Sequence, residues 1–315
     1  MSVLSEPHFH DEAAAYEFVE AKIWPNGPVC PHCGGVERIS KMSGKSTRIG
    51  AYKCYQCRKP FTVKIGTVFE ASHVPMHHWL QAIFLMASSK KGISSNQLHR
   101  TLGCTLKTAW FMSHRLREAM RDGNLGPLGG NGLLVETDET YYGPTKEKRT
   151  TTTSGAPFTK SGKTGPSNKR AIVGLVERGG AVKTFHVASA TKENVAKIVV
   201  EHIAPESVLV TDESRLYPTV GAKFLSHWTV KHSAGEYARG GVHTNNIESY
   251  FSVFKRGMRG VYQHCDEKHL HRYLAEFDFR HNRRVALGVN DVTRAEQVLL
   301  GVVGKRLSYE TTSAR

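Results

Sequence analysis

The sequence lacks any long apolar segment. None of its apolar runs approaches the roughly 18 residues that a helix needs to cross a bilayer. Its first residues also lack the succession of basic, apolar and small residues that marks a secretory signal peptide. These absences argue against a membrane-spanning or secreted chain. We therefore expect a cytoplasmic protein without a membrane partner.

Acidic residues and cysteines are scarce as well. The chain has 28 Asp+Glu against 43 Lys+Arg, which gives a formal net charge of +15 and a pI near 9.6. Such an excess of positive charge attracts polyanions, of which nucleic acid is the better match. The six cysteines are not expected to form disulfides in a reducing compartment, so metal binding or packing must explain their spacing.

Four of the cysteines form two identical pairs. Cys30-Pro-His-Cys33 and Cys54-Tyr-Gln-Cys57 are separated by 20 residues, which is zinc-site spacing, because each tight turn offers two sulfurs to one ion. We predict a four-cysteine zinc ribbon over residues 26–70, after an N-terminal segment of residues 1–25. The alternative is four buried or reactive thiols. A closed four-thiolate site is structural, and the ribbon is expected to help hold DNA or to dock on protein.

A helical pattern follows the ribbon. The apolar spacing and Gly92 and Gly103 predict three helices within residues 76–122, with the last two arranged as a helix-turn-helix. A plain three-helix bundle is the alternative. The residues expected to contact DNA from this region are Lys107, His114, Arg115 and Arg117.

The pattern of the third region predicts an α/β domain. The apolar runs 133–137 and 207–211 predict strands that end at Asp138 and Asp212, and between them a hairpin (170–177 and 181–188) precedes a helix (192–203). A further strand is expected at 225–231. This order, with carboxylates after the first and fourth strands, predicts a mixed sheet with an RNase H-like core. The two aspartates would then share divalent cations, since Mg²⁺ prefers carboxylate oxygens.

A helix that begins near Asn245 and is expected to carry an asparagine cap supplies a third acid. Glu248 and Lys255 are seven residues apart and so share one helix face, with the acid toward the metal and the lysine toward the DNA backbone. The adjacent Arg256 is also expected to bind DNA. Between Asp212 and Glu248 lie 35 residues, a spacing that resembles the DD(35)E signature of transposases and retroviral integrases.

These motifs together closely resemble the IS1595-family (ISXO2-like) insertion-sequence transposases, from roughly residue 12 to residue 295. The resemblance rests on the paired cysteines, the helix-turn-helix, Thr137-Asp138-Glu139, Val210-Thr211-Asp212, and the stretches 243–257, 269–273 and 279–283. It implies a catalytic set of Asp138, Asp212 and Glu248, with Lys255 as the trailing basic residue. Some branches of the family carry Asn as the third residue, so Asn245 and Asn246 are the alternatives to Glu248.

The resemblance implies a DDE transposase that cuts DNA at the ends of its element and joins it to target DNA. The expected cofactors are two Mg²⁺ or Mn²⁺ ions and a structural Zn²⁺, and the expected partners are the terminal inverted repeats, target DNA and further copies of the chain in a synaptic complex. We assign the catalytic domain to residues 132–300, with a flexible basic insert at 143–169 and a tail at 301–315. A regulator without catalysis and a nuclease that does not join DNA are the rival interpretations.

Overall fold

The computed structural model describes residues 2–123, 125–145, 169–231 and 241–308. Most of the predicted basic insert, residues 146–168, lies outside these ranges. The chain divides into two compact units, one formed by residues 1–121 and 283–315 and the other by residues 122–282. Within the described ranges, no helix is long and apolar enough to cross a membrane.

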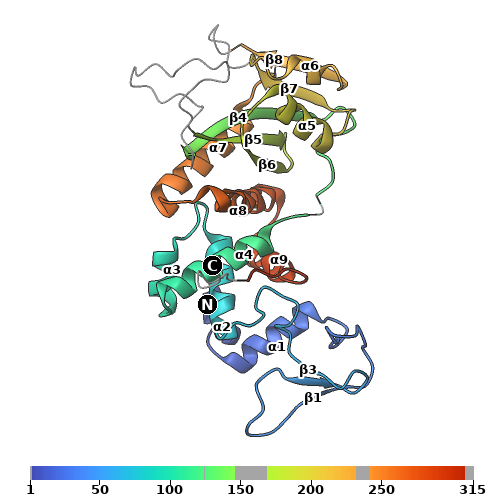
Figure 1. Cartoon of the computed structure of the whole chain (residues 1–315), viewed down its shortest axis with the longest axis vertical. Coiled ribbons are helices and arrows are strands. Elements are labelled where there is room, and N and C mark those ends of the chain that lie inside the picture. The colour runs from blue at the N-terminus through green and yellow to red at the C-terminus, as the bar shows by residue number, and fades with distance from the viewer. Residues whose placement is uncertain (1, 124, 146–168, 232–240, 309–315) are drawn as a thin grey trace, which may run out of the picture. The chain divides into compact units, whose positions relative to one another are not determined.

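The first unit begins with short helices and a small sheet (Figure 1). Its strands β1 (Ile39–Lys41), β2 (Tyr52–Cys54) and β3 (Pro60–Phe61) pair antiparallel in that order. Before them come η1 (Val3–Ser5), η2 (Pro7–Phe9) and α1 (Glu12–Ile23). The Tyr52 hydroxyl donates to Glu20 of α1 at 2.7 Å, and Trp24 packs edge-on against Tyr52 and Phe61. The sheet is therefore anchored to α1.

Three helices follow at the predicted positions, namely α2 (Met76–Ser88), α3 (Ser95–Leu102) and α4 (Leu106–Met120). The side chains of Ser94 and Thr105 cap α3 and α4 by accepting from the third backbone N–H that follows each. Gly103 ends α3 in the left-handed conformation, with φ 64°.

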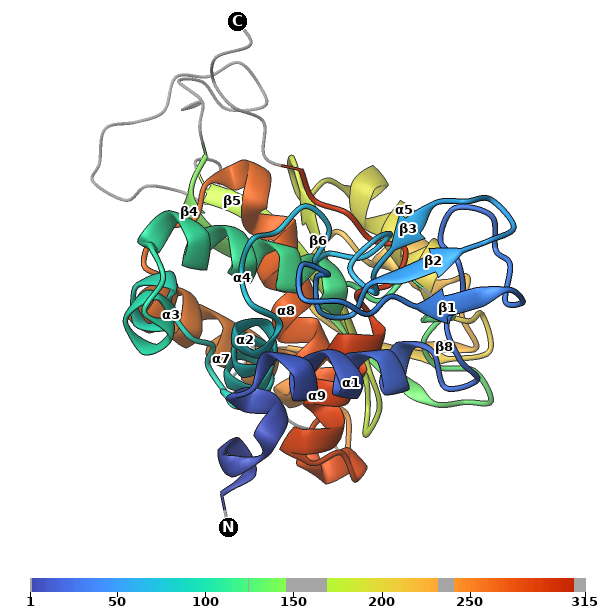
Figure 2. The same ribbon diagram turned by 90° about the horizontal axis from the view of Figure 1, so that it is seen from below.

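The catalytic domain that we predicted to reach residue 300 ends earlier in the structure. The unit formed by residues 122–282 stops before η7 (Val285–Leu287) and α9 (Asp291–Leu300). Helix α9 instead packs on α1, α2 and α4 of the first unit, and Figure 2 shows it beside α1 and α2. The buried Val298 and Leu299 explain this, because α9 needs an apolar partner and the first unit supplies it.

The second unit is built on a five-stranded mixed sheet with the order β6-β5-β4-β7-β8. Strands β4 (Leu134–Pro144), β5 (Lys169–Glu177) and β6 (Val182–Val187) pair antiparallel, whereas β7 (Val208–Asp212) and β8 (Ser226–Val230) run parallel to β4. The predicted succession of strands and helices along the chain is confirmed, and so is the prediction that the strands carrying Asp138 and Asp212 are neighbours.

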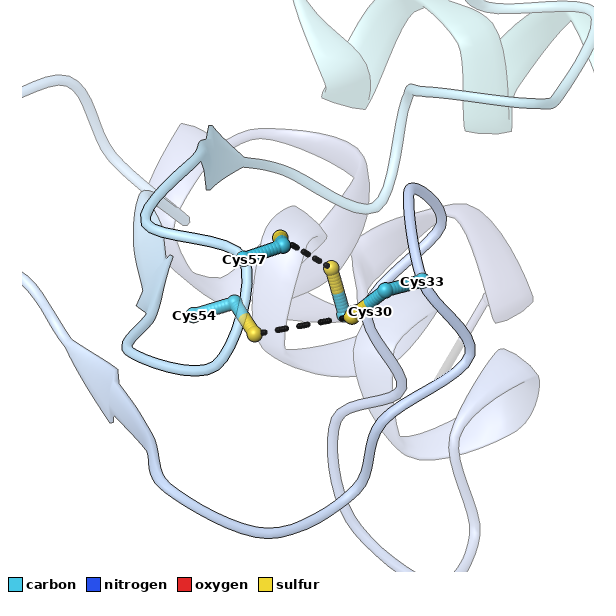
Figure 3. Close-up of side chains that lie close together, drawn as sticks. All are labelled: Cys30, Cys33, Cys54 and Cys57. Atoms are coloured by element: carbon cyan, nitrogen blue, oxygen red, sulfur yellow. Dashed lines mark hydrogen bonds between the residues drawn. The ribbon is translucent and has the colours of Figure 1, made fainter.

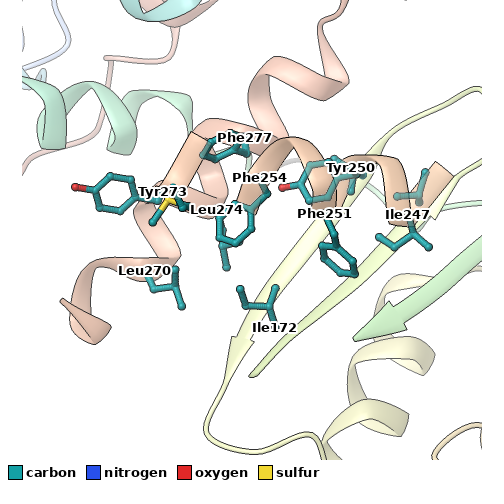
Figure 4. Packing of buried hydrophobic residues seen from close by; sticks show 12 residues of the cluster. Ile172, Ile247, Tyr250, Phe251, Phe254, Leu270, Tyr273, Leu274 and Phe277 are labelled. Carbon is teal, nitrogen blue, oxygen red and sulfur yellow. The ribbon is translucent and has the colours of Figure 1, made fainter. Parts of the chain in front are cut away.

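Helices cover both faces of this sheet (Figure 1). Helices α5 (Lys192–His202) and α6 (Pro218–Gly221) belong with one apolar cluster, which includes Val135, Leu175 and Leu209. The opposite face carries α7 (Asn245–Gly257), η5 (Met258–Tyr262), η6 (Glu267–His269) and α8 (Leu270–Asn282). Figure 4 shows the packing there, where aromatic side chains of α7 and α8 lie against Ile172 of β5.

Two local predictions were wrong. Strand β4 does not end at Asp138 but continues to Pro144, because β5 keeps pairing with it after the parallel pairing with β7 has stopped at Thr137↔Thr211. Helix α7 is also not capped by an asparagine, since Thr244 occupies the N-cap position. Asp138 therefore lies within a strand at the point where one neighbouring strand ends.

Gly174 of β5 allows α7 to approach the sheet closely. It pairs with Asp138 across the strands, and a Cβ at this position would lie 2.6 Å from Cδ1 of Ile247 and 2.7 Å from Cζ of Phe251. Real Cβ atoms do not approach carbon so closely. A side chain here would push α7 away from the strand that carries Asp138.

We predict that Gly174→Val lowers the stability of the second unit. The overpacking that it causes costs about 1–3 kcal/mol, which urea denaturation of the purified protein would measure. Gly123→Val is the matched control, because a Cβ at Gly123 meets no atom within 4 Å. Equal stability losses in the two variants would contradict the close approach of α7.

Candidate active site

The pairing of β4 with β7 brings two aspartates side by side. The last registered pair is Thr137↔Thr211, so Asp138 and Asp212 follow as the next neighbours on strands about 4.8 Å apart. Side chains alternate along a strand, and Glu136, two residues before Asp138, binds α7. Asp138 and Asp212 therefore share the face of the sheet that α7 covers.

The electrostatics of Asp138 indicate that several acids meet here. Burial raises the pKa of Asp138 to about 7, with further contributions from the negative charges of Glu139, Asp212 and Glu248. Its Oδ1 accepts the N–H of Glu139 at 2.8 Å, while Oδ1 of Asp212 accepts the N–H of Ser214 at 3.0 Å. The three acids expected from the sequence thus lie near one another.

A cavity of about 430 Å³ lies between β4 and α7. Glu248, Ser252, Lys255 and Arg259 recur every three or four residues along α7 and η5 and therefore share one helical face. Burial lowers the pKa of Lys255, and the negative charge of Asp138 opposes this shift. Acids and cations thus line the same cavity, whose lining comprises Asp138, Glu139, Thr140, Glu248, Phe251, Ser252, Lys255, Arg256 and Arg259.

The acids offer oxygen ligands that could hold divalent cations. Among the residues that the structure describes, only the four paired cysteines bring three or more ligand atoms within 4.8 Å of one another, so Asp138, Asp212 and Glu248 stand farther apart than that. The carboxylate chemistry suits Mg²⁺ or Mn²⁺.

The geometry favours Glu248 over the neighbouring asparagines. The side-chain amide of Asn246 donates to Glu136 Oε1 at 2.7 Å, so it is engaged away from the other acids. Asn245 is exposed. Glu248 lines the cavity and accepts a hydrogen bond of 2.9 Å from the hydroxyl of Thr244.

Two acids near the site have roles that the sequence reasoning missed. Glu139 accepts hydrogen bonds from the hydroxyls of Tyr217 and Ser214, the latter at 3.3 Å, and burial raises its pKa. It thereby joins β4 to the segment that follows Asp212. Glu136 is fully buried and contacts the start of α7. For Glu136, the sequence offered one signal, namely a charged residue within an otherwise apolar run. A charged residue that is buried in such a strand needs a partner.

The four cysteines of the first unit meet as predicted (Figure 3). The Sγ atoms of Cys30 and Cys57 are 3.6 Å apart, those of Cys33 and Cys54 are 3.8 Å apart, and all four lie within 4.8 Å of one another. Four sulfurs at about 2.3 Å from a tetrahedral zinc would be about 3.8 Å apart. The cluster is consistent with structural zinc.

Three of the side chains predicted to contact DNA are buried instead. His114, Arg115 and Arg117 are 1%, 6% and 1% exposed, because α4 is packed among α2, α3 and α9. Arg115 donates to the carbonyl oxygens of Val68 and Glu70 at 2.7 and 2.9 Å. These side chains hold the first unit together and do not face solvent, whereas Lys107 is exposed.

Comparisons with known proteins match two parts of the chain to transposase families. Residues 127–282 match the family described as the ISXO2-like transposase domain, and residues 10–60 match the transposase zinc-ribbon domain. An uncharacterized protein in transposable element ISH50 of Halobacterium salinarum is 28% identical over 280 residues, which cover 86% of this chain and 91% of that protein. An uncharacterized transposase-like protein of Haemophilus influenzae is 26% identical over 101 residues, covering 32% and 80%.

A solved structure, that of a pre-cleavage Mos1 transpososome, matches with 10% identity and covers 95% of this chain and 94% of its own, but its TM-score of 0.24 is too low to support a fold assignment. The two family matches define the class, a transposase with an RNase H-like domain and a zinc ribbon. The chain belongs to the IS1595 family of ISXO2-like transposases.

We predict that Cys54→Ser removes the zinc. The variant should lose nearly all of the roughly one equivalent of zinc expected in the wild type, and its ribbon should unfold, because metal binding and folding are coupled in such sites. Elemental analysis and circular dichroism would measure both. Cys104→Ser, at a cysteine outside the cluster, should keep its zinc, and a full zinc content in Cys54→Ser would refute the site.

A second prediction follows from the raised pKa of Asp138. The pKa of the Asp138 carboxyl is about 7 in the folded protein against an ordinary value of 3.8. The stability of the folded protein therefore falls as the pH rises between these two values, because the charged form is disfavoured only in the folded state. Asp138→Asn should therefore melt several degrees higher than the metal-free wild type at pH 8, with the difference vanishing near pH 4. Scanning calorimetry across pH tests this, with the exposed Asp266→Asn as the control. A difference independent of pH would contradict it.

Proposed function

We propose that this chain is a DDE transposase that cuts DNA at the ends of its insertion sequence and transfers the freed strand into target DNA. The observation that carries the proposal is that Asp138 and Glu248 line one cavity with the cations of α7, while the negative charges of Asp212 and Glu248 act on Asp138. Membership of the transposase family supports the same conclusion.

The charges of the cavity suit a DNA phosphodiester. A phosphodiester is anionic and resists attack, so the site must neutralise and orient it. Lys255, Arg256 and Arg259 line the cavity and would hold phosphate oxygens close to Asp138. The three carboxylates would hold two divalent cations. Bound there, such ions supply Lewis acidity to the attacking and leaving oxygens.

One such site can serve both steps of the reaction. Water attacks first and releases a 3′-hydroxyl at the element end, and that hydroxyl then attacks a phosphodiester of target DNA. A covalent bond between protein and DNA is not needed. Tyr141 and Tyr142 are poor nucleophiles, since burial raises the pKa of both phenols, and the ring of Tyr142 packs edge-on against Phe254.

The remaining modules are proposed to bind the element ends. Lys107 lies exposed at the start of α4, where the predicted helix-turn-helix would meet DNA. Two copies of the chain in a synaptic complex would bring two element ends together. The ribbon would add phosphate contacts from its exposed basic side chains, which are Arg38, Lys41, Lys45, Arg48, Arg58 and Lys59.

The test is strand transfer by the purified protein with Mg²⁺ or Mn²⁺ and the DNA that flanks its own gene. We expect Asp138→Ala and Asp212→Ala to lower product formation by more than about 100-fold. Loss of a residue that only hydrogen-bonds a metal ligand costs up to about 100-fold, and loss of the ligand itself should cost more. Glu248→Gln should lower it strongly as well. Glu193→Gln, at an exposed acid in the first turn of α5, is the control.

The outcomes separate the rival functions. Products that persist in Asp138→Ala would refute the proposed site. A wild type that binds the DNA ends but never cleaves them would identify a regulator. A wild type that nicks DNA without forming joined products would identify a nuclease.

A further inference from the structure

Glu136 is a buried acid whose carboxylate binds the first turn of α7. It is 0% exposed in the middle of β4. Its Oε2 accepts the backbone N–H groups of Asn246 and Ile247 at 2.9 and 3.1 Å, and its Oε1 accepts the side-chain amide of Asn246 at 2.7 Å. A side chain from the sheet thus accepts the free N–H groups of the first turn of α7, a role that usually belongs to the residue just before the helix.

Arg178 supplies the charge that balances this carboxylate. Its Nε and Nη2 lie 3.2 and 3.0 Å from Oε1 of Glu136. The same guanidinium donates to the carbonyl oxygens of Gly241 and His243 at 2.7 and 3.1 Å. Glu136 and Arg178 together therefore bind the segment that leads into α7 and the first turn of the helix itself.

These contacts connect two of the candidate acids by a short path. Glu136 precedes Asp138 by two residues and points to the same face of β4. Ile247, whose N–H binds Glu136, directly precedes Glu248. A displacement at the start of α7 would therefore move Glu248 relative to Asp138, while the rest of the sheet could stay in place.

We propose that Glu136 is a positioning residue, which fixes the start of α7 so that Glu248 can share divalent cations with Asp138 and Asp212. The inference rests on the proposed function of the site. Glu136 itself does not reach the metal, because both of its oxygens are engaged by α7 and Arg178.

The chemistry requires a carboxylate at this position. Its hydrogen-bond partners are all donors, namely two backbone N–H groups, one amide and one guanidinium, and Nδ1 of His243 lies 3.4 Å from Oε1. An ionised carboxylate only accepts hydrogen bonds, whereas a glutamine amide would turn an N–H group toward these donors. The negative charge also lies at the positive end of the α7 dipole. Glu136→Gln keeps the volume and removes both advantages.

Metal binding provides a readout that is independent of DNA cleavage. Manganese binding to the full-length, zinc-loaded protein would be followed by electron paramagnetic resonance, and the signal lost in Asp138→Asn defines binding at this site. We expect Glu136→Gln to weaken that binding by about 10–100-fold. Glu276→Gln is the matched control, because Glu276 is also 0% exposed and binds Arg280 on α8. The control should bind Mn²⁺ within about twofold of the wild type.

Asn246→Ala separates positioning from ligation. It removes the amide but leaves both backbone N–H contacts to Glu136, so we expect only a several-fold loss of Mn²⁺ affinity. A loss as complete as that of Asp138→Asn would make Asn246 a metal ligand and overturn the proposal. Unchanged Mn²⁺ affinity in Glu136→Gln would overturn it as well.

Hydrogen exchange in the metal-free protein tests the same contact without any cation. In Glu136→Gln, the amides of residues 245–248 should exchange faster than in the wild type, while Glu276→Gln should leave them unchanged. Equal protection in Glu136→Gln and the wild type would refute the positioning role even if the wild type binds Mn²⁺. Wild-type protein that shows no Asp138-dependent Mn²⁺ signal would refute the proposed function instead, and the exchange rates would still decide whether Glu136 holds α7.

Discussion

The repulsion between carboxylates that β4 and β7 bring side by side is the constraint on which the second unit depends. Burial and the charges of three neighbouring acids raise the pKa of Asp138 to about 7. Each of the other acids is tied to a partner of its own. Glu139 binds Tyr217, Asp212 accepts the backbone N–H of Ser214, and Glu248 accepts from Thr244. The fold thus holds the acids in place individually, and the proposed cations would balance the charge that remains.

The place of α7 follows from two different interactions. Gly174 permits Ile247 and Phe251 to lie directly on the sheet, which sets the distance of the helix from β4. Glu136 binds the first turn, which sets where along β4 the helix begins. Once the distance and the starting point of α7 are fixed, the helical spacing places Glu248 near the aspartates. It also places Lys255 about one turn after Ser252 along the cavity.

The sequence predicted the features that depend on local pattern and missed those that depend on packing. Apolar runs predicted the strands, and the acids at the ends of those runs led to Asp138 and Asp212. The polar stretch after Thr137 wrongly suggested that β4 ends there, because pairing with β5 is not visible in local composition. Glu136 was missed for a related reason. A single acid in a strand looks like an outward-facing residue until the helix that covers it is known.

The same distinction explains the error on α4 and changes how the charge of the chain should be understood. Arginines on a helix that is predicted to enter DNA look like DNA contacts, yet a guanidinium also suits the interior when carbonyl oxygens surround it, as with Arg115. Five arginines are buried in the described part of the chain, namely Arg115, Arg117, Arg170, Arg280 and Arg294. The formal charge of +15 therefore overstates the positive charge that the helices expose to DNA. Under the proposed function, phosphate contacts then fall to exposed cations such as those of the zinc ribbon and to Lys255, Arg256 and Arg259, which line the cavity.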